Sequence, residues 1–248
     1  MTISNKYREK LSAYLFEPPE IGRYMLVVCH GFRGNKDNGG RIFEFAKKLQ
    51  KLGIGTLAFD FSGSGNSEGD FSRITLTRQA DDLQKVLNYV DDMFSLPNIL
   101  LGRSFGGSTV LAGGSKDPRI AGYILWSAPA KLEQTFAKIM PEEFKRMKRG
   151  ETAKIRDEAG EYMLYPDLVL DFNRHDMDSC LQDIKSRPVL IVQAKDDEVV
   201  DPSNAFYMQA RLNNCSLSLV ENAGHRFLDK TALREEMTIE WLREKFQL

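Results

Sequence analysis

Continuous apolar runs alternate with helically spaced apolar positions over most of the chain. The segments predicted as strands cover 24–29, 54–61, 98–101, 120–126, 188–193 and 216–220, and among them 24–29 and 120–126 are apolar runs typical of strands buried on both faces of a sheet. Apolar residues at helical spacing cover 41–52, 75–93, 105–114, 202–212 and 232–246. A loosely alternating segment at 11–17 is typical of an edge strand. This order predicts an α/β fold, with a mostly parallel central sheet and helices on both faces.

The alternation is interrupted after the run at 120–126, where charges of both signs are mixed. The pattern there predicts an amphipathic helix over 131–148 and a short hairpin at 162–171. The α/β rhythm then resumes, so we expect an insertion on one core rather than an independent domain. The predicted division assigns residues 1–129 and 187–248 to the α/β core and residues 130–186 to an inserted cap.

Composition narrows the class of protein and of partner. A chain of 248 residues with 42% apolar residues can form one larger domain with a sizeable core. The net charge of −1 argues against a nucleic acid or an anionic membrane as partner, because both favour a basic excess. The apolar runs are too short to span a bilayer, and the first 20 residues hold no long apolar stretch, so no secretory signal is expected.

The cysteines indicate a reducing compartment. Cys29, Cys180 and Cys215 form an odd, sparse set without C-x-x-C spacing, which predicts free thiols in a cytoplasmic protein.

The glycine-rich stretch 60–69 fits no P-loop, and Asp60 is expected to bond backbone N–H groups there. No cofactor is expected. The sequence leaves the oligomeric state open, a homodimer included.

The segment Gly102-Arg103-Ser104-Phe105-Gly106 lies between an apolar strand and a helix of small residues. This is G-x-S-x-G in the strand–turn–helix context that a nucleophile turn requires. Side chains at Gly102 and Gly106 would clash in so tight a turn, whose strained backbone exposes the serine Oγ. The five-residue pattern also occurs by chance, but its context predicts Ser104 as a nucleophile.

The loop His30-Gly31-Phe32 follows the apolar run at 24–29. In this arrangement the second donor to an oxyanion comes from the loop after an earlier strand. We therefore predict that the backbone N–H groups of Phe32 and Phe105 form an oxyanion hole, with Gly31 permitting the close approach. His30 is expected to support the loop through its ring nitrogens rather than to act as a base.

Only His30, His175 and His225 could supply an imidazole base. His225 follows the run at 216–220, so it lies at the carboxyl edge of the sheet, where α/β active sites gather. We predict it as the general base. His175 lies in the expected cap, in a stretch without typical metal-ligand spacing, so a solvated loop and no metal site are expected.

The acid that orients His225 should follow a strand between Ser104 and His225 in chain order. The run at 188–193 is followed by four competing acids, Asp196, Asp197, Glu198 and Asp201. We favour Asp197, with Asp196 second, and expect the others to be caps or surface charges. The acid would fix the tautomer of His225 and stabilise its imidazolium.

Together these motifs resemble the α/β-hydrolase superfamily from the first strand to the last helix. The matching pieces are HGF at 30–32, DFSGSGNSEG at 60–69, GRSFGG at 102–107, KDDEVV at 195–200 and NAGH at 222–225. They are similar to bacterial serine esterases that include cinnamoyl (feruloyl) esterases and monoacylglycerol-lipase-like enzymes. In that subgroup the acid stands in a G-x-x-D-x-x-V pattern. Here Ala194 replaces the glycine while Asp197 and Val200 fit, which favours Asp197 over Asp196.

The resemblance implies a serine carboxylesterase acting on small to medium acyl or aryl esters, with the cap shaping the pocket. A peptidase is the alternative, since many proteins with these motifs are called serine aminopeptidases. It would need an acidic anchor in the cap, and the acids available are Glu133, Glu142, Glu143, Glu158 and Glu161. A non-catalytic binding protein is disfavoured because all three triad positions are filled. Arg103 stands where relatives often have His, and would tie down the loops or favour an acidic substrate.

Overall fold

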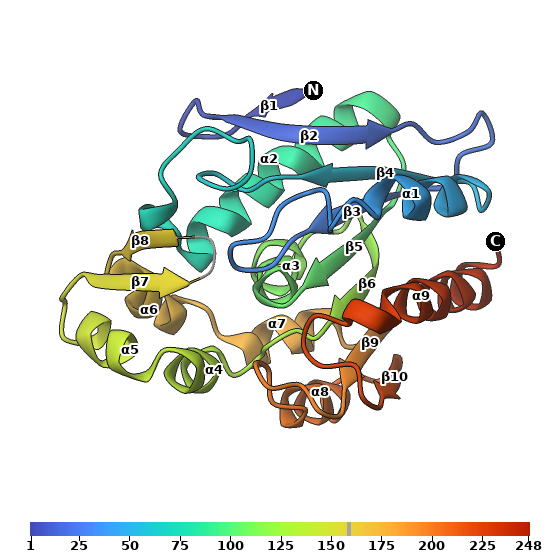
Figure 1. Cartoon of the computed structure of the whole chain (residues 1–248). Coiled ribbons are helices and arrows are strands. Elements are labelled where there is room, and N and C mark those ends of the chain that lie inside the picture. Colours follow the sequence, from blue (N-terminus) through green and yellow to red (C-terminus); the bar gives the residue numbers. More distant parts are fainter. Residues whose placement is uncertain (158–159) are drawn as a thin grey trace.

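The computed structural model describes residues 1–157 and 160–248 and is built around one eight-stranded sheet (Figure 1). Its strands are β1 (Thr2–Ser4), β2 (Lys10–Phe16), β3 (Tyr24–Cys29), β4 (Ile54–Phe59), β5 (Asn98–Arg103), β6 (Ile120–Trp126), β9 (Val189–Ala194) and β10 (Cys215–Val220). Their order is β1-β2-β4-β3-β5-β6-β9-β10, and every pair from β4 to β10 is parallel. The predicted mostly parallel sheet is therefore confirmed.

The first two strands differ from the expected edge. β2 pairs antiparallel with β4 on one side and with the three-residue β1 on the other, so β1 forms the edge. The pattern did not predict β1, because three residues are too few to show a period of two. Short outer strands of this kind protect a sheet from pairing with other chains.

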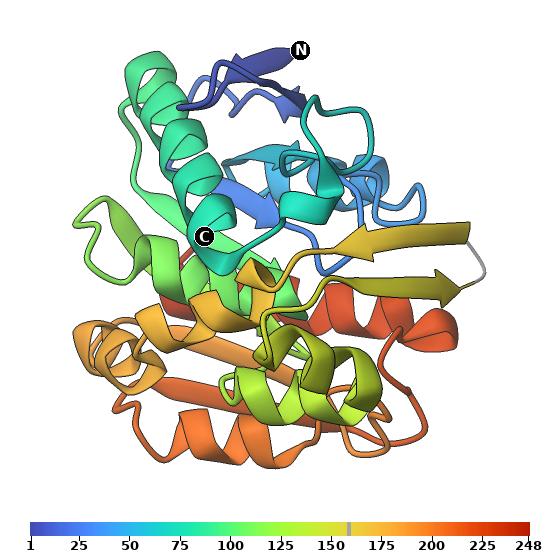
Figure 2. The ribbon, with the colours of Figure 1, turned by 90° about the vertical axis from the view of Figure 1, so that its left-hand side faces the viewer.

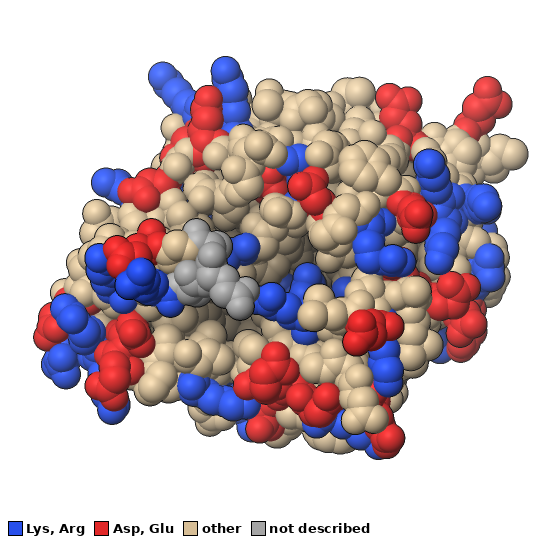
Figure 3. All heavy atoms as spheres, in the orientation of Figure 1, with Lys and Arg blue, Asp and Glu red and all other residues tan. Residues whose placement is uncertain are grey.

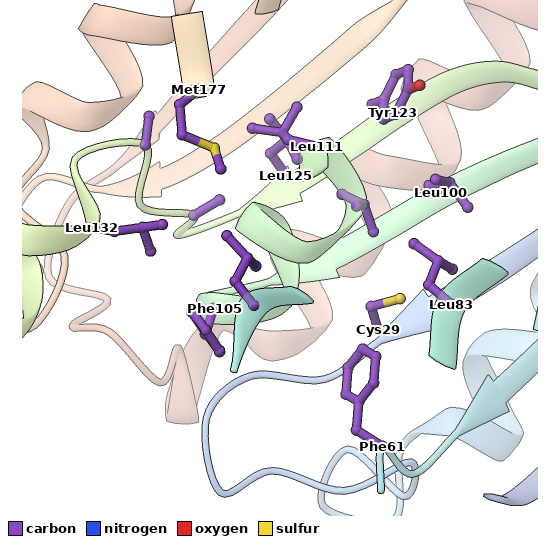
Figure 4. Close-up of a cluster of buried hydrophobic side chains, with 14 of the residues drawn as sticks. Cys29, Phe61, Leu83, Leu100, Phe105, Leu111, Tyr123, Leu125, Leu132 and Met177 are labelled. Carbon is purple, nitrogen blue, oxygen red and sulfur yellow. The ribbon is translucent and has the colours of Figure 1, made fainter. Parts of the chain in front are cut away.

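Helices cover both faces of the sheet, as predicted. One face carries α2 (Leu76–Phe94), α3 (Phe105–Gly114), α7 (Met177–Ile184) and α8 (Ser203–Gln209), and the other carries α1 (Ile42–Gln50) and α9 (Thr231–Phe246). Figure 4 shows part of the first core, in which Leu100 of β5 and Leu111 of α3 both lie. Leu101, the next residue of β5, belongs to the second core with Leu242 of α9. Successive strand residues thus face opposite helical layers.

The cap segment contains more elements than the pattern predicted. Between β6 and β9 lie α4 (Leu132–Ile139), α5 (Pro141–Lys148), β7 (Ala153–Asp157), β8 (Gly160–Leu164), α6 (Asp167–Leu170), the 3₁₀ turn Asp171–Arg174 and α7. The single helix predicted over 131–148 is wrong: Pro141 disfavours helical backbone at Met140, which has φ −144° and ψ 66°, so two helices result. The hairpin predicted at 162–171 is also misplaced, since β7 pairs with β8 and the chain after β8 turns into α6.

The β7–β8 hairpin and the α4–α5 pair stand in front of the carboxyl ends of the central strands (Figure 2). Helix α7, at the end of the segment 130–186, packs against α3 and so lies on the helical layer of the sheet. The part of this segment that overhangs the sheet is therefore α4 to β8. Among the described helices, none has the length and apolar content needed to cross a membrane.

Candidate active site

The turn between β5 and α3 holds Ser104 in a strained conformation. Its φ is 51° and its ψ −127°, a backbone region that residues other than glycine rarely adopt. A Cβ on Gly102 would lie 2.4 Å from the carbonyl oxygen of Gly106, and a Cβ on Gly106 would lie 2.4 Å from that of Cys29. Both glycines are thus required by close packing, which is the support predicted for this turn.

The structure brings together the three side chains predicted to form a triad. His225 Nε2 lies 3.1 Å from Ser104 Oγ, and His225 Nδ1 lies 2.9 Å and 3.0 Å from the two carboxylate oxygens of Asp197. These are hydrogen-bonding distances along the whole line. A carboxylate on Nδ1 keeps the proton there and leaves Nε2 free to accept a proton from the serine.

Asp197, just after the end of β9, is fixed by several hydrogen bonds besides the one with His225. Its side chain is fully buried and accepts hydrogen bonds from the N–H groups of Val199 and Val200 and from Gln193 Nε2. Burial alone would raise the pKa of Asp197. The hydrogen bond and charge of His225 and the two backbone N–H groups outweigh burial and lower that pKa below its usual value. Asp197 is therefore an anion at neutral pH.

The competing acids have other partners. Asp196 accepts hydrogen bonds from the N–H groups of Ala223 and Gly224, and Glu198 accepts one from the N–H of His225. Asp201 accepts one from the N–H of Ser203 at the start of α8. Asp196 and Glu198 therefore shape the loop that carries His225 without touching its ring.

The loop predicted to complete an oxyanion hole lies against the serine. A Cβ on Gly31 would stand 3.0 Å from Ser104 Cβ, which shows how closely this backbone approaches. In the described part of the chain, the N–H groups of Phe32 and Phe105 have no backbone acceptor. Neither of the two donors predicted for an oxyanion therefore has a backbone partner within residues 1–157 and 160–248.

His30 supports this loop and is not placed as a base. Its Nδ1 lies 2.8 Å from the carbonyl oxygen of Gly31, and its Nε2 accepts a hydrogen bond from the N–H of Phe61 at 3.1 Å. This pair of contacts fits the neutral tautomer with the proton on Nδ1. Burial lowers the pKa of His30, which also favours the neutral ring.

A buried ion pair joins the loop after β3 to the loop after β4. The Asp60 carboxylate accepts hydrogen bonds from Lys36 Nζ at 2.7 Å, the N–H of Lys36 at 2.6 Å and the N–H of Asn66 at 2.9 Å. The side chains of Asp60 and Lys36 are 0% and 3% exposed. The backbone contacts expected of Asp60 are therefore present, together with an ion pair that the sequence did not suggest.

Removing the Asp60 carboxylate should destabilise the whole protein. Asp60→Ala leaves the Lys36 ammonium buried without its anion, and we expect a loss of about 3–5 kcal/mol in the free energy of unfolding, measured by urea titration. Glu142→Ala is the control, because its ion pair with Lys145 is exposed and should leave the urea midpoint unchanged. Equal midpoints for the two variants would show that the buried pair does not stabilise the fold.

A cavity of about 1200 Å³ opens above Ser104 and His225, beneath the overhanging cap. Figure 3 shows a hollow on the face seen in Figure 1, with basic residues at its edge. On the cap side, Phe32 packs against Phe71, Phe105 and Phe136, with ring centroids 5.3–6.3 Å apart. The basic residues that line the cavity are Arg33, Lys36, Arg41, Arg103, Arg156, Arg226 and Arg234, whereas Glu143 is the one acid among its described lining residues.

His175 lies outside this cavity. It is not the solvated loop residue that the sequence suggested, because its Nε2 contacts Thr77 Oγ1 at 2.8 Å and it is half-buried beside Asp171. It therefore ties the end of the cap segment to α2. No cluster of His, Cys, Asp or Glu within residues 1–157 and 160–248 could hold a metal ion.

Sequence reasoning missed two residues of the site. Gln193 holds Asp197 from within β9, and Arg234 of α9 lines the cavity although it is 1% exposed. No motif marks either residue. The sequence nevertheless held a signal for Arg234. Arg234 lies on the same face of its helix as the apolar residues Trp241 and Leu242, and a charged residue is unusual on the face that packs against the core.

A protein family and a solved structure each match more than half of the chain. The model of the family described as serine aminopeptidase, S33, matches residues 22–158, which is more than half of the chain. The ferulic-acid-bound structure of Est1E from Butyrivibrio proteoclasticus is similar with a TM-score of 0.85 and 22% identity over 100% of both chains. At that identity the likeness shows the fold alone.

Curated relatives match over part of their length. The quorum-quenching protein AidA of Acinetobacter baumannii is 33% identical over 46% of this chain, and human monoglyceride lipase is 32% identical over 46%. The chain spans 39% of the length of each of these relatives. The family match and the sheet topology agree: this chain has the α/β-hydrolase fold and belongs to the serine aminopeptidase S33 family.

Proposed function

We propose that the chain is a serine carboxylesterase for small to medium acyl or aryl esters. The observation that carries the proposal is the continuous hydrogen-bonded line from Ser104 through His225 to Asp197 at the floor of one cavity. A buried carboxylate, an oriented imidazole and a strained, half-buried serine that lines the cavity are the arrangement that activates a hydroxyl as a nucleophile.

The reaction would proceed through an acyl-enzyme. Ser104 Oγ attacks the ester carbonyl carbon while its proton passes to His225 Nε2. His225 then gives this proton to the leaving alkoxide, the C–O bond breaks, and the alcohol departs. A water molecule, deprotonated by His225, attacks the acyl-enzyme, and the proton returns to Ser104 as the carboxylic acid leaves.

The tetrahedral intermediate needs two donors beside the serine. The N–H groups of Phe32 and Phe105 would bind its negative oxygen, and Gly31 keeps the first of them close. Since Phe105 opens α3, the partial positive charge of the helix N-terminus adds to the stabilisation.

The charge of the cavity favours esters over peptides with a free amino terminus. Most of the acidic anchors suggested by the sequence are exposed and paired with lysines: Glu133 with Lys148, Glu142 with Lys145 and Glu161 with Lys154. Glu158 lies outside the described residues. Of the described candidates, only Glu143 reaches the cavity, where it stands among seven basic residues, two of which, Lys36 and Arg41, are paired with Asp60 and Glu235. An ammonium group on the substrate would be repelled there.

Matched ester and amide substrates test the proposal. We expect 4-nitrophenyl butyrate to be hydrolysed at least about 100-fold faster, in kcat/KM, than butyryl-4-nitroanilide or alanyl-4-nitroanilide, and a fluorophosphonate to label the protein. Faster turnover of alanyl-4-nitroanilide, lost in Glu143→Gln, would establish the aminopeptidase instead. An enzyme that cleaves none of these substrates and resists labelling would contradict both activities.

A further inference from the structure

Two arginines lie side by side in the wall of the cavity, next to the serine. Arg103 ends β5 and, by strand alternation, faces the same helical layer as Leu101, the layer of α1 and α9. Its register partner on β6 is Trp126, and Arg234 of α9 stacks on that indole ring at 4.2 Å. Both arginines line the cavity that contains Ser104.

Arg234 forms no ion pair with an acid of the described chain, although the charge of the neighbouring Glu235 still attracts it. Its Nε and Nη1 are buried without a hydrogen-bond partner within residues 1–157 and 160–248. The neighbouring Glu235 is not available, because both of its oxygens bond the guanidinium of Arg41 at 2.9 Å and 2.7 Å. Arg234 is held instead by the rings of Trp126 and Phe227, which position it without removing its charge.

Arg103 is little better paired. Within the described residues, Arg103 donates one side-chain hydrogen bond, from Nη1 to Asn38 Oδ1 at 3.4 Å, and the nearby Asp197 is already bonded to His225. Burial and then repulsion from Arg226 lower the pKa of Arg103. Burial and then repulsion from Arg103 lower the pKa of Arg234 to about 9. A half-buried cation, Arg103, and a fully buried one, Arg234, therefore repel each other beside Ser104, which is costly unless an anion binds between them.

We propose that Arg103 and Arg234 form a subsite for an anionic group of the substrate, a carboxylate or a phosphate, on the α1/α9 side of Ser104. This inference rests on the proposed esterase function and names its substrate class. Planar guanidinium groups bind both anions through paired N–H donors. The substrate is then an ester with an apolar part and a charged part on opposite sides of the scissile bond.

The other side of Ser104 is apolar, and we expect it to bind the apolar part of the substrate. Phe105 belongs to the core on the α2/α3 face and contacts Phe136 and Phe172 of the cap segment, with ring centroids 5.4 Å and 6.2 Å away. Trp126 and Phe227, which hold Arg234, belong to the core on the other face. Ser104 stands at the border of these two environments.

Paired esters that differ only in charge test the subsite. On the acyl side, mono-4-nitrophenyl glutarate is compared with 4-nitrophenyl hexanoate. On the alcohol side, 4-acetoxybenzoate is compared with 4-acetoxybenzamide. We expect kcat/KM of the wild-type chain to favour the anionic member of one pair by at least about tenfold, and Arg103→Met and Arg234→Met each to reduce that preference at least about tenfold. Lysine at either position should restore part of it, and Arg149→Met, an exposed arginine of the cap, is the control.

A binding measurement separates this proposal from the proposed function. Calorimetry with glutarate and with inorganic phosphate should show binding to the wild-type chain that weakens in Arg234→Met and Arg103→Met, and the tighter of the two ligands identifies the anion. Anion binding without hydrolysis of any ester would overturn the esterase and keep the subsite. Hydrolysis of the neutral esters with no charge preference in either pair, and with neither anion bound, would overturn the subsite alone. Thermal melting of each variant shows whether it is folded. If a methionine variant does not fold, the lysine variant at the same position, Arg103→Lys or Arg234→Lys, is measured instead.

Discussion

Ser104→Ala is expected to lower kcat for 4-nitrophenyl butyrate by roughly 10⁴- to 10⁶-fold, with the protein still folded. The substitution removes the hydroxyl oxygen that lies 3.1 Å from His225 Nε2, so the proposed nucleophile is lost while Asp197 and the two N–H donors remain. A small residual rate over water would persist from the oxyanion donors. Initial rates under saturating substrate measure the effect, and the absence of fluorophosphonate labelling provides a second readout.

Ser179→Ala is the matched control for this substitution. Ser179 is exposed on α7, and its backbone N–H bonds Asp176 while its hydroxyl lies away from the cavity of Ser104. This variant should keep wild-type rates and labelling. Retention of ester hydrolysis by Ser104→Ala would favour a different nucleophile, and unchanged biological activity of Ser104→Ala would favour a binding protein on this scaffold.

The core of the fold could be predicted because its signals are local. Buried parallel strands such as β3, β5 and β9 show as continuous apolar runs, and Thr75 and the αL residue Ser95 end α2 close to the limits of its periodic pattern. The turn at Ser104 was equally visible, since close backbone approach requires glycine on both sides. These features are fixed by neighbours within a few residues.

What could not be predicted depends on distant parts of the chain. The split at Met140 follows from a proline rule that the helical period alone does not include. The unpaired state of Arg234 depends on Arg41 binding Glu235, a contact between helices almost two hundred residues apart. The ion pair of Lys36 with Asp60 joins two loops in the same way. Tertiary contacts of this kind leave no periodic trace in the sequence.

The choice between the adjacent acids Asp197 and Asp196 leads to the second large effect. We expect Asp197→Asn to lower kcat by about 10⁴-fold, the size of effect seen when the acid of a serine triad becomes an amide. The amide oxygen of asparagine can still accept the hydrogen bonds from the N–H groups of Val199 and Val200 that Oδ1 of Asp197 now accepts. The other carboxylate oxygen becomes an NH₂ group facing His225 Nδ1, which forces the tautomer with the proton on Nε2. That ring cannot accept the proton of Ser104.

The fold should tolerate this change, because Gln193 can adapt to it. Gln193 now donates Nε2 to Asp197 Oδ2 while its own Oε1 is buried without a partner in the described chain. Rotation of the Gln193 amide would let Oε1 accept from the new NH₂ group, but it would give up the hydrogen bonds that Nε2 now donates to the carbonyl oxygens of Ala194 and Val200, so Asp197→Asn should melt below the wild-type temperature while remaining folded. Its defect is therefore expected in kcat rather than in folding.

Asp196→Asn is the matched comparison, one residue away with the same chemical change. Asp196 is exposed and its two oxygens accept from the N–H groups of Ala223 and Gly224, so the single amide oxygen of asparagine can keep one of these two bonds, and kcat should fall no more than about threefold because Asp196 does not touch the ring of His225. Rates at saturating 4-nitrophenyl butyrate, with melting temperatures of both variants, give the comparison. A larger loss of kcat in Asp196→Asn than in Asp197→Asn would assign the orienting acid to Asp196, and equal small losses would mean that His225 needs no carboxylate to act on Ser104.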